Sequence, residues 1–240
     1  MKVRHVLFSL VCIAAVLSVS LRAADEGSVK GVVHFGGDIP DSKPIEVPVK
    51  DQEGCKCKEV ENEVMIIDKG TKGIKDVIVR VLDVKAAAAP GDTKVPELDQ
   101  KGCKFTPHIT IVKPGSTVDL LNPDKIIHNF HTTPLDLTNP AMNIAMQAEK
   151  QTIKDKYFAE PEIIQVQCDM HPWMKGYIVV HDPRFVAVTG TDGAFEIKGL
   201  PAGKYKVSVF HGNLGEQTLD VEVKAGAASD MGEVKFPVKK

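Results

Sequence analysis

Short runs of β-branched and aromatic residues, each bounded by glycine or proline, recur along this chain and limit its fold more than any other feature. The 240 residues include 19 Gly and 15 Pro. After Asp182-Pro183 such runs follow one another about every eight to twelve residues, a spacing typical of β-sandwiches. No helical periodicity of comparable strength is present. The chain is therefore predicted to be all-β, with two successive β-sandwiches.

The predicted strands fall into two groups on either side of Asp182-Pro183. Residues 38–62, rich in Pro, Lys, Asp and Glu, are expected to be an irregular surface segment, and residues 138–152 a short helix. A hairpin is expected around Lys113-Pro114-Gly115. The strands are predicted at 29–35, 64–68, 77–84, 109–112, 116–121, 163–168 and 176–181, and then at 185–189, 195–198, 205–211 and 217–223.

The first 23 residues have the pattern of a secretory signal peptide. Lys2 and Arg4 precede a mostly apolar run at 6–19, and Ala23 offers a small residue at the cleavage site. The run is shorter than the roughly 20 residues that span a bilayer, which favours cleavage over a membrane anchor. We expect a periplasmic or secreted protein with no stable membrane insertion after cleavage.

The charge balance argues against a nucleic-acid partner. The formal net charge is −2, and without residues 1–23 the chain has 27 basic and 32 acidic residues, a net charge of −5. This balance excludes a broad basic surface of the kind that binds nucleic acids.

Residues with soft or imidazole ligand atoms concentrate in two segments. Cys168, His171 and Met174 follow the strand predicted at 163–168, and His128 lies about forty residues earlier. One thiolate, two imidazoles and a weak thioether form the ligand set of a blue-copper site. A tight loop after the strand would return His171 and Met174 to the position of Cys168. Zinc prefers harder or more numerous thiolate ligands, so copper is predicted.

The C-x-x-H-x-x-M spacing of this loop resembles the copper-binding loop of the cupredoxin family, in its amicyanin and plastocyanin-like branch. The dipeptide His128-Asn129 also resembles the first-ligand segment of that family. The resemblance implies a cupredoxin-like Greek-key β-sandwich over residues 27–182, in which Asn129 tethers the two ligand loops. It implies one type 1 copper ion held by His128, Cys168, His171 and Met174.

Other histidines remain open as ligands. His128 and His131 are three residues apart, and in a strand they would face opposite sides, so only one of them is expected to reach the metal. The match to the family favours His128, while His131 remains an alternative ligand or the ligand of a second ion. For His108, near a strand start, a structural role is favoured. His34, His181 and His211 are also expected to be structural.

Residues 184–238 resemble the carboxypeptidase regulatory-like module, a small transthyretin-like β-sandwich. The resemblance lies in the sequences TDGAFEI at 191–197 and GLPAGKY at 199–205. Asp-Gly and Pro-Ala-Gly supply tight turns, and the apolar residues beside them alternate toward one core. Related folds sometimes bind carbohydrate, but this segment has no aromatic platform. Structural support is therefore favoured.

One disulfide bond is predicted in the exported chain. With residues 1–23 removed and Cys168 on copper, three cysteines remain, and an oxidising compartment permits two of them to pair. A bridge from Cys103 to either Cys55 or Cys57 is expected, with the connectivity left open.

Together these features predict a one-electron carrier that is not an enzyme and that exchanges electrons with periplasmic redox proteins. No Ser/His/Asp arrangement and no paired acid and base are recognised. Two alternatives remain. One is a periplasmic copper carrier or storage protein, which the methionines Met142, Met146, Met170 and Met174 keep open. The other is a carbohydrate-binding or adhesion module of cupredoxin shape.

His171 is predicted to be the exposed edge of the copper site. It lies in a loop, and connecting loops tend to lie at the surface. Met170, Pro172 and Trp173 around it would form an apolar docking patch for a redox partner, and His128 would be the more buried imidazole.

Overall fold

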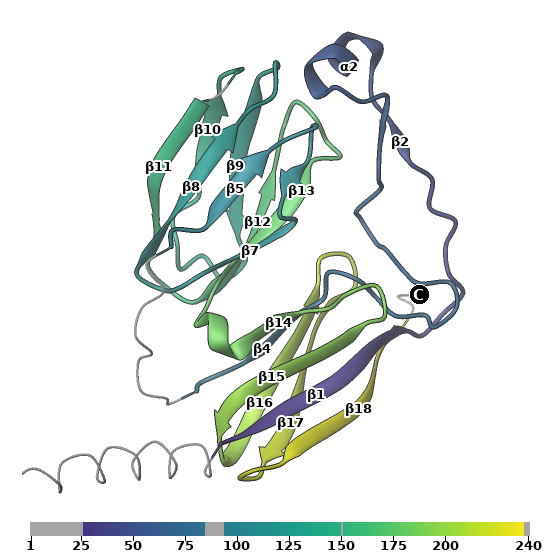
Figure 1. The fold of residues 1–240 in the computed structure, drawn as a ribbon, viewed down its shortest axis with the longest axis vertical. Coiled ribbons are helices and arrows are strands. Elements are labelled where there is room, and N and C mark those ends of the chain that lie inside the picture. Colours follow the sequence, from purple (N-terminus) through teal and green to yellow (C-terminus); the bar gives the residue numbers. More distant parts are fainter. Residues whose placement is uncertain (1–25, 85–93, 150, 238–240) are drawn as a thin grey trace, which may run out of the picture.

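The computed structural model describes residues 26–84, 94–149 and 151–237, so the predicted signal peptide lies outside the described residues. The fold is built from two β-sandwiches, one above the other in Figure 1. This arrangement confirms the predicted all-β class. Across the described ranges, no helix has the length and apolar character that would let it cross a membrane.

The first sandwich carries the predicted ligands and packs a five-stranded sheet against a four-stranded sheet. The strand orders are β10-β9-β12-β13-β7 and β11-β8-β5-β6. Buried side chains from both sheets form one core, with Phe105, Phe130 and Phe158 among the largest. The strands are β5 (Glu97–Gln100), β6 (Phe105–Thr106), β7 (Ile109–Val112), β8 (Ser116–Asn122), β9 (His128–Pro134), β10 (Asn143–Met146), β11 (Gln151–Phe158), β12 (Glu162–Gln167) and β13 (Lys175–Val180).

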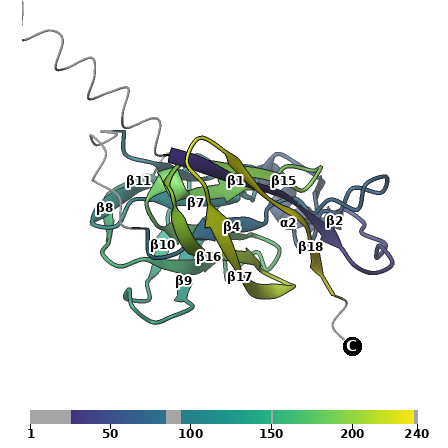
Figure 2. The same ribbon diagram turned by 90° about the horizontal axis from the view of Figure 1, so that it is seen from below.

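The second sandwich has strand orders β14-β4-β16-β17 and β15-β1-β18. Figure 2 shows it from below, with β1 and β15 along one side and β16 and β17 along the other. Its core includes Phe35, Phe185, Phe195 and Phe236. The elements are β1 (Glu26–Phe35), β4 (Ile78–Val81), η1 (Pro183–Phe185), β14 (Val186–Val188), β15 (Ala194–Pro201), β16 (Gly203–His211), β17 (Gly215–Val223) and β18 (Ala228–Phe236).

The strand pairing differs from the expected division of the chain into 27–182 and 184–238. Strand β1 pairs with β15 and β18, and β4 pairs with β14 and β16, so two early strands belong to the second sandwich. The turn at Asp192-Gly193 fixes one of these contacts. Gly193 has φ +73°, and a Cβ there would lie 2.2 Å from the carbonyl oxygen of Val33. The alternating, β-branched residues of 29–35 predict a strand, but the strands that pair with it are determined by residues distant in the sequence.

A third apolar cluster joins the two sandwiches. Ile109, Ile163 and Val179 of the first sandwich pack against residues of the second. The ring of Tyr177 meets the ring of Phe210 edge-on, with centroids 5.6 Å apart. The residues contributed by the second sandwich are Ile78, Val186 and Phe210.

The segment between β1 and β4 leaves the second sandwich and returns to it, and we call residues 36–77 the arm. It contains β2 (Ile45–Glu46), the seven-residue helix α2 (Val49–Cys55) and β3 (Glu59–Val60). Figure 1 shows α2 at the far end of the arm, beside the first sandwich. The arm thus carries a helix from one sandwich to the end of the other, where sequence indicated only an irregular segment.

Three local expectations are wrong. Strands β7 and β8 flank the turn at 113–115 but lie in different sheets, so they do not form a hairpin. Residues 143–146 form β10, an edge strand beside β9, instead of part of a helix at 138–152. Residues 64–68 contribute only an isolated bridge at Ile67. In each case contacts distant in sequence override the local pattern.

A buried carboxylate shapes the loop between β9 and β10. Glu162 accepts hydrogen bonds from the backbone N–H groups of Asp136 (2.6 Å) and Asn139 (2.9 Å) and from the hydroxyl of Thr138 (2.9 Å). Burial opposes ionisation of Glu162, but the hydrogen bonds from Asn139, Thr138 and Asp136 outweigh it and lower the pKa of its carboxyl. The ionised form is therefore the one that stabilises this loop.

Replacing this carboxylate should destabilise the fold in a pH-dependent way. Glu162→Gln is expected to lose about 2 kcal/mol of unfolding free energy at neutral pH, because charge-assisted hydrogen bonds are lost. A lowered pKa stabilises the fold at pH values above the ordinary glutamate pKa, and this contribution disappears as the pH falls through the lowered value. Urea unfolding of both proteins between neutral and acidic pH should show the difference shrinking. Exposed Glu160→Gln is the control, and an equal loss there would contradict the role of Glu162.

Candidate metal centre

The loop between β12 and β13 brings its sulfur and imidazole groups together as the spacing predicted. The backbone N–H of Met174 donates to the carbonyl of His171 at 2.8 Å, and the N–H of Cys168 donates to the carbonyl of Met174 at 3.1 Å. These bonds close a tight loop between two antiparallel strands. Cys168, His171 and Met174 are all buried, with 1 to 2% of each residue exposed.

His128 reaches the same point from the start of β9. Its Nδ1 lies 3.0 Å from Nδ1 of His171, and that nitrogen lies 3.5 Å from Sγ of Cys168. One ligand atom from each of these three residues lies within 4.8 Å of the others. Two imidazole nitrogens and one sulfur thus converge inside the first sandwich. Met174 is buried in the same core and bonded to the loop through its backbone.

Asn129 ties the two ligand segments together, as the family resemblance implied. Its backbone N–H donates to Sγ of Cys168 at 3.4 Å. Its side-chain oxygen accepts from the N–H of Asp169 at 2.6 Å, while its amide nitrogen donates to the Asp169 carboxylate at 2.9 Å. These three bonds fix the start of β9 against Cys168 and Asp169.

A carboxylate that sequence reasoning did not identify orients His128. Asp124 lies between β8 and β9, and its Oδ2 accepts from Nε2 of His128 at 3.0 Å. The same side chain accepts from the N–H groups of Gly102 (2.9 Å) and Cys103 (2.8 Å). Placing the proton on Nε2 leaves Nδ1 of His128 as the nitrogen that faces His171 and Cys168.

These contacts favour the thiolate form of Cys168. Burial raises the pKa of its thiol, but hydrogen bonds from His128, His171 and the Asn129 N–H outweigh burial and lower the pKa to about 6. For the His128 imidazole, burial lowers the pKa, but its hydrogen bonds to Asp124 and Cys168 outweigh burial and raise that pKa. The thiolate is the form that ligates metals.

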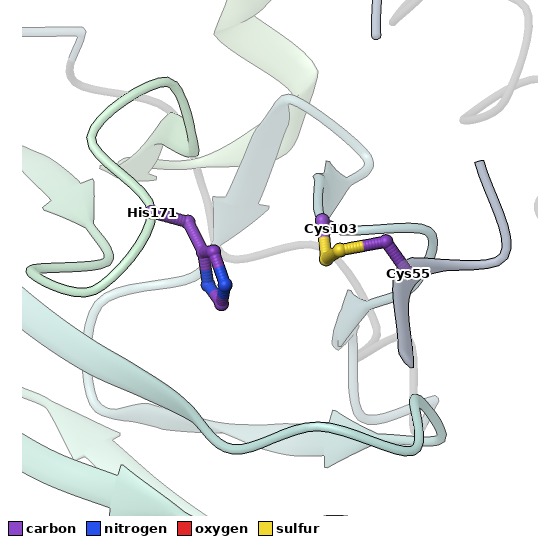
Figure 3. A group of neighbouring side chains, drawn as sticks. All are labelled: Cys55, Cys103 and His171. Atoms are coloured by element: carbon purple, nitrogen blue, oxygen red, sulfur yellow. A yellow bond between two sulfur atoms is a disulfide. The ribbon is translucent and has the colours of Figure 1, made fainter. Parts of the chain in front are cut away.

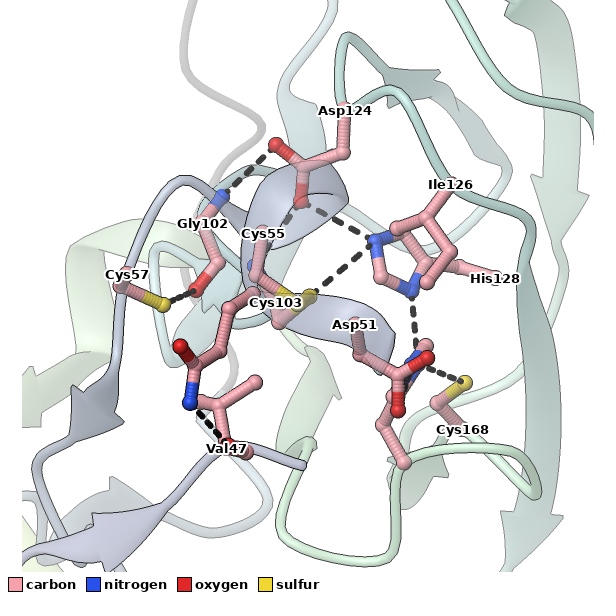
Figure 4. The surroundings of a disulfide bond; sticks show 12 residues. Val47, Asp51, Cys55, Cys57, Gly102, Cys103, Asp124, Ile126, His128 and Cys168 are labelled. Atoms are coloured by element: carbon pink, nitrogen blue, oxygen red, sulfur yellow. Dashed lines mark hydrogen bonds and ion pairs between the residues drawn. A yellow bond between two sulfur atoms is a disulfide. The ribbon is translucent and has the colours of Figure 1, made fainter. Parts of the chain in front are cut away.

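The arm covers this centre, and a disulfide holds it there. Cys55, at the end of α2, is bonded to Cys103 across 48 residues, which confirms the predicted bridge and selects Cys55 over Cys57. Gly54 sits so close that a Cβ there would lie 2.6 Å from Cβ of Ile126. Figure 4 shows the disulfide beside His128 and Asp124, and Sγ of Cys103 lies 3.9 Å from Nε2 of His128.

The expectation that His171 is the exposed edge of the site is wrong. Only 2% of this residue is exposed. Asp51 of α2 lies over it, with Oδ2 3.9 Å from Nε2, and the Trp173 ring packs against it at 5.2 Å between centroids. Trp173 also donates to the carbonyl of Cys103 at 3.1 Å, so the expected docking patch is partly closed. Met170 of the loop is exposed at the surface, but Asp51 of α2 and Trp173 cover His171.

The other histidines in the part of the chain that the structure describes lie apart from this centre. His131 faces the other side of β9, where its Nδ1 pairs with Asp169 at 2.9 Å and 34% of its side chain is exposed. His108 and His211 line a small cavity of about 30 Å³ between the sandwiches. Burial lowers the pKa of both, that of His211 to about 4.

Two parts of the site were missed from sequence for different reasons. Asp124, in Asn122-Pro-Asp-Lys, carries no motif, although its place four residues before His128 was a signal that could have been weighed. The cover by α2 was beyond sequence reasoning, because the segment 38–62 shows no helical periodicity.

Comparison with known proteins gives partial structural matches. No protein-family model matches the chain, and no curated protein matches it. A purple cupredoxin from Nitrosopumilus maritimus aligns at 19% identity and a TM-score of 0.30, over 35% of this chain and 98% of its own length. Two amicyanin variants, one a Cu(I) form and one reduced, align at 25% identity with TM-scores of 0.33 and 0.32, each over 43% of this chain and 98% of its own length.

The cover should protect His171 from chemical modification. Diethyl pyrocarbonate is expected to label His131 first and His171 slowly, since labelling requires access to the ring. Cys103→Ser removes the bridge that holds α2 and should speed His171 labelling about tenfold through easier local opening. Peptide mapping by mass spectrometry measures both sites. Cys57→Ser is the matched control, and rapid labelling of His171 in the unmodified sequence would refute the cover.

Proposed function

We propose that this chain is an exported copper protein that carries one electron at a time. The observation that carries the proposal is the convergence of two imidazole Nδ1 atoms and one thiolate sulfur in a buried pocket. His128, Cys168 and His171 would hold the ion, with Met174 as the weak fourth ligand. Copper bound there would supply one-electron chemistry between Cu(II) and Cu(I).

The donor set fits copper better than the other metals that proteins commonly bind. A single thiolate with two imidazoles lacks the hard oxygen ligands that magnesium and calcium require. Structural zinc sites are closed by four strong ligands, whereas the fourth donor here is a thioether. Soft sulfur suits Cu(I), and imidazole suits both oxidation states.

The residues around the ligands support electron transfer without a substrate position. Asn129 and Asp124 fix both ligand segments by hydrogen bonds, so the ligand atoms are held before a metal arrives. The arm and Trp173 keep water away from His171. Ligands that are held in place and shielded from water lower the reorganisation energy that accompanies a change of oxidation state. We also infer that the chain is not an enzyme.

The cover also changes where a redox partner would dock. Residues with exposed apolar side chains surround the covered pocket: Val49 on α2, Ile127 beside His128, and Met170 in the loop after β12. We propose that a periplasmic redox protein meets this end of the sandwich over a small interface, as transient partners do. The ring edge of His171 is not part of that interface.

Export is supported by the disulfide, which persists in oxidising compartments. The second sandwich is proposed to act as structural support, because it carries both ends of the arm that covers the metal pocket. Its resemblance to the carboxypeptidase regulatory-like module stays a prediction.

The visible spectrum of the copper-loaded protein tests the proposed centre. Cu(II) bound to the Cys168 thiolate is expected to give an intense visible charge-transfer band and a type 1 EPR signal. Cys168→Ser should abolish the band while the far-UV circular dichroism is unchanged. Cys57→Ser removes a free thiol outside the pocket and should leave the band intact. Full copper binding without such a band would refute the proposal.

A second test addresses the orientation of His128. Asp124→Asn is expected to weaken Cu(II) binding about 10–100-fold, the usual effect of losing a partner that orients a ligand. Asp51→Asn is the matched control: its carboxylate is 3.9 Å from His171, too long for a hydrogen bond, so the change should be less than about threefold. Competition with a chelator measures both affinities. Equal effects of the two substitutions would contradict the role of Asp124.

A further inference from the structure

The disulfide that holds the arm lies against a ring of the proposed copper centre. The sulfurs of Cys55 and Cys103 and one ring nitrogen of His171 all lie within 4.8 Å of one another. Figure 3 shows His171 reaching this point from the loop after β12, and Cys55 from the end of α2. The His171 ring therefore borders two groups of ligand atoms, one with His128 and Cys168 and the other with the disulfide.

In the disulfide form this second group cannot bind a metal strongly, because disulfide sulfurs are poor ligands. Reduction changes that. A dithiol that reduces the bridge breaks the Cys55–Cys103 S–S bond and forms its own S–S bond, and two electrons and two protons pass to the protein. Two thiols then stand beside an imidazole in a buried space. Binding of Cu(I) displaces the two thiol protons and changes no oxidation state.

The surroundings suit a soft cation. Two thiolates and one imidazole are ligands that select Cu(I). Asp124 lies 3.0 Å from His128 Nε2, and one of its oxygens lies within 4.8 Å of Sγ of Cys103. Asp51 lies 3.9 Å from His171 Nε2. These two carboxylates add negative charge next to the cluster.

The helix that carries Cys55 is suited to opening. It has seven residues, begins without a side-chain cap hydrogen bond, and leaves Val49 85% exposed at its first position. Helices of this length are marginal without tertiary contacts. Cys55 itself is 1% exposed, so a reductant reaches the bridge when α2 opens locally.

We propose that reduction of the Cys55–Cys103 disulfide creates a second copper site, for Cu(I), formed by Cys55, Cys103 and His171. Because the His171 ring borders both groups of ligand atoms, Cu(I) bound at the second site would lie next to the ligands of the first. The reduced arm is thus a point of entry for copper into the pocket. This transfer rests on the proposed function, whereas the second site itself does not need Cys168.

Cys57 provides a matched control on the same arm. It is a free thiol two residues from Cys55, and its Sγ approaches the carbonyl oxygen of Gly102 at 3.8 Å. Among the described residues it belongs to none of the groups of converging ligand atoms. A site formed by the disulfide cysteines should therefore be insensitive to this thiol.

The test uses the Cys168→Ser protein, which removes the first site and leaves the arm intact. The disulfide is opened with a phosphine until thiol counting shows complete reduction, and the phosphine is then removed under anaerobic conditions. Cu(I) is titrated against bathocuproine disulfonate. We expect one Cu(I) to bind at least about 100-fold more tightly after reduction than before. X-ray absorption should show two sulfur neighbours.

Added substitutions locate the site. Cys103→Ser in this background should remove the gain on reduction, and Cys57→Ser should keep it. No gain on reduction, a gain that survives Cys103→Ser, or a gain lost with Cys57→Ser would each overturn the proposal. If Cys103→Ser fails to fold, the sulfur count in reduced Cys168→Ser decides: two sulfurs support the site and fewer refute it. The spectrum of the copper-loaded protein with its disulfide intact tests the first centre separately.

Discussion

The covalent bond between Cys55 and Cys103 is the constraint that fixes the end of the arm over the proposed metal centre. It joins the tip of an arm rooted in the second sandwich to a loop of the first. The arm is also held by Val47 and Val60, which are buried in the core of the first sandwich, and the disulfide fixes the end of its seven-residue helix beside His171. The hydrogen bonds of Asp124 link this loop to His128, so cover and ligand are positioned by the same few residues.

The pocket combines features that are usually separate. Asn129 fixes the ligand segments to each other, as expected for a centre that keeps its geometry while its charge changes. The arm, in contrast, is attached at its tip by a bond that thiols can open. The pocket is thus rigid on the side of the strands and reversible on the side of the arm. An electron carrier needs the first property, and exchange of the metal needs the second.

Sequence alone could predict the ligand loop because its information is local. A strand, a short loop and three donor side chains lie within residues 163–174. The alternation of side chains along a strand is equally local, and it placed His128 and His131 correctly on opposite faces of β9. The parts that failed depend on distant contacts. Nothing in 29–35 indicates that this strand pairs with β18, and nothing in 49–55 indicates a helix over His171. The prediction that His171 is exposed therefore failed, because it rested on the tendency of loops to lie at the surface.

The path of the arm has a consequence for dissecting the molecule. Strand β1 and strand β4 both lie in the second sandwich, while α2 between them caps the first. No single cut in the sequence separates the two sandwiches. A fragment that starts at residue 94 keeps every proposed copper ligand, but it lacks the arm that covers them. It also lacks β1 and β4, which belong to the second sandwich. The arm therefore links the two sandwiches beyond their direct packing. An insertion or deletion within 36–77 would alter how α2 fits over the ligands of the first sandwich, although the arm begins and ends in the second.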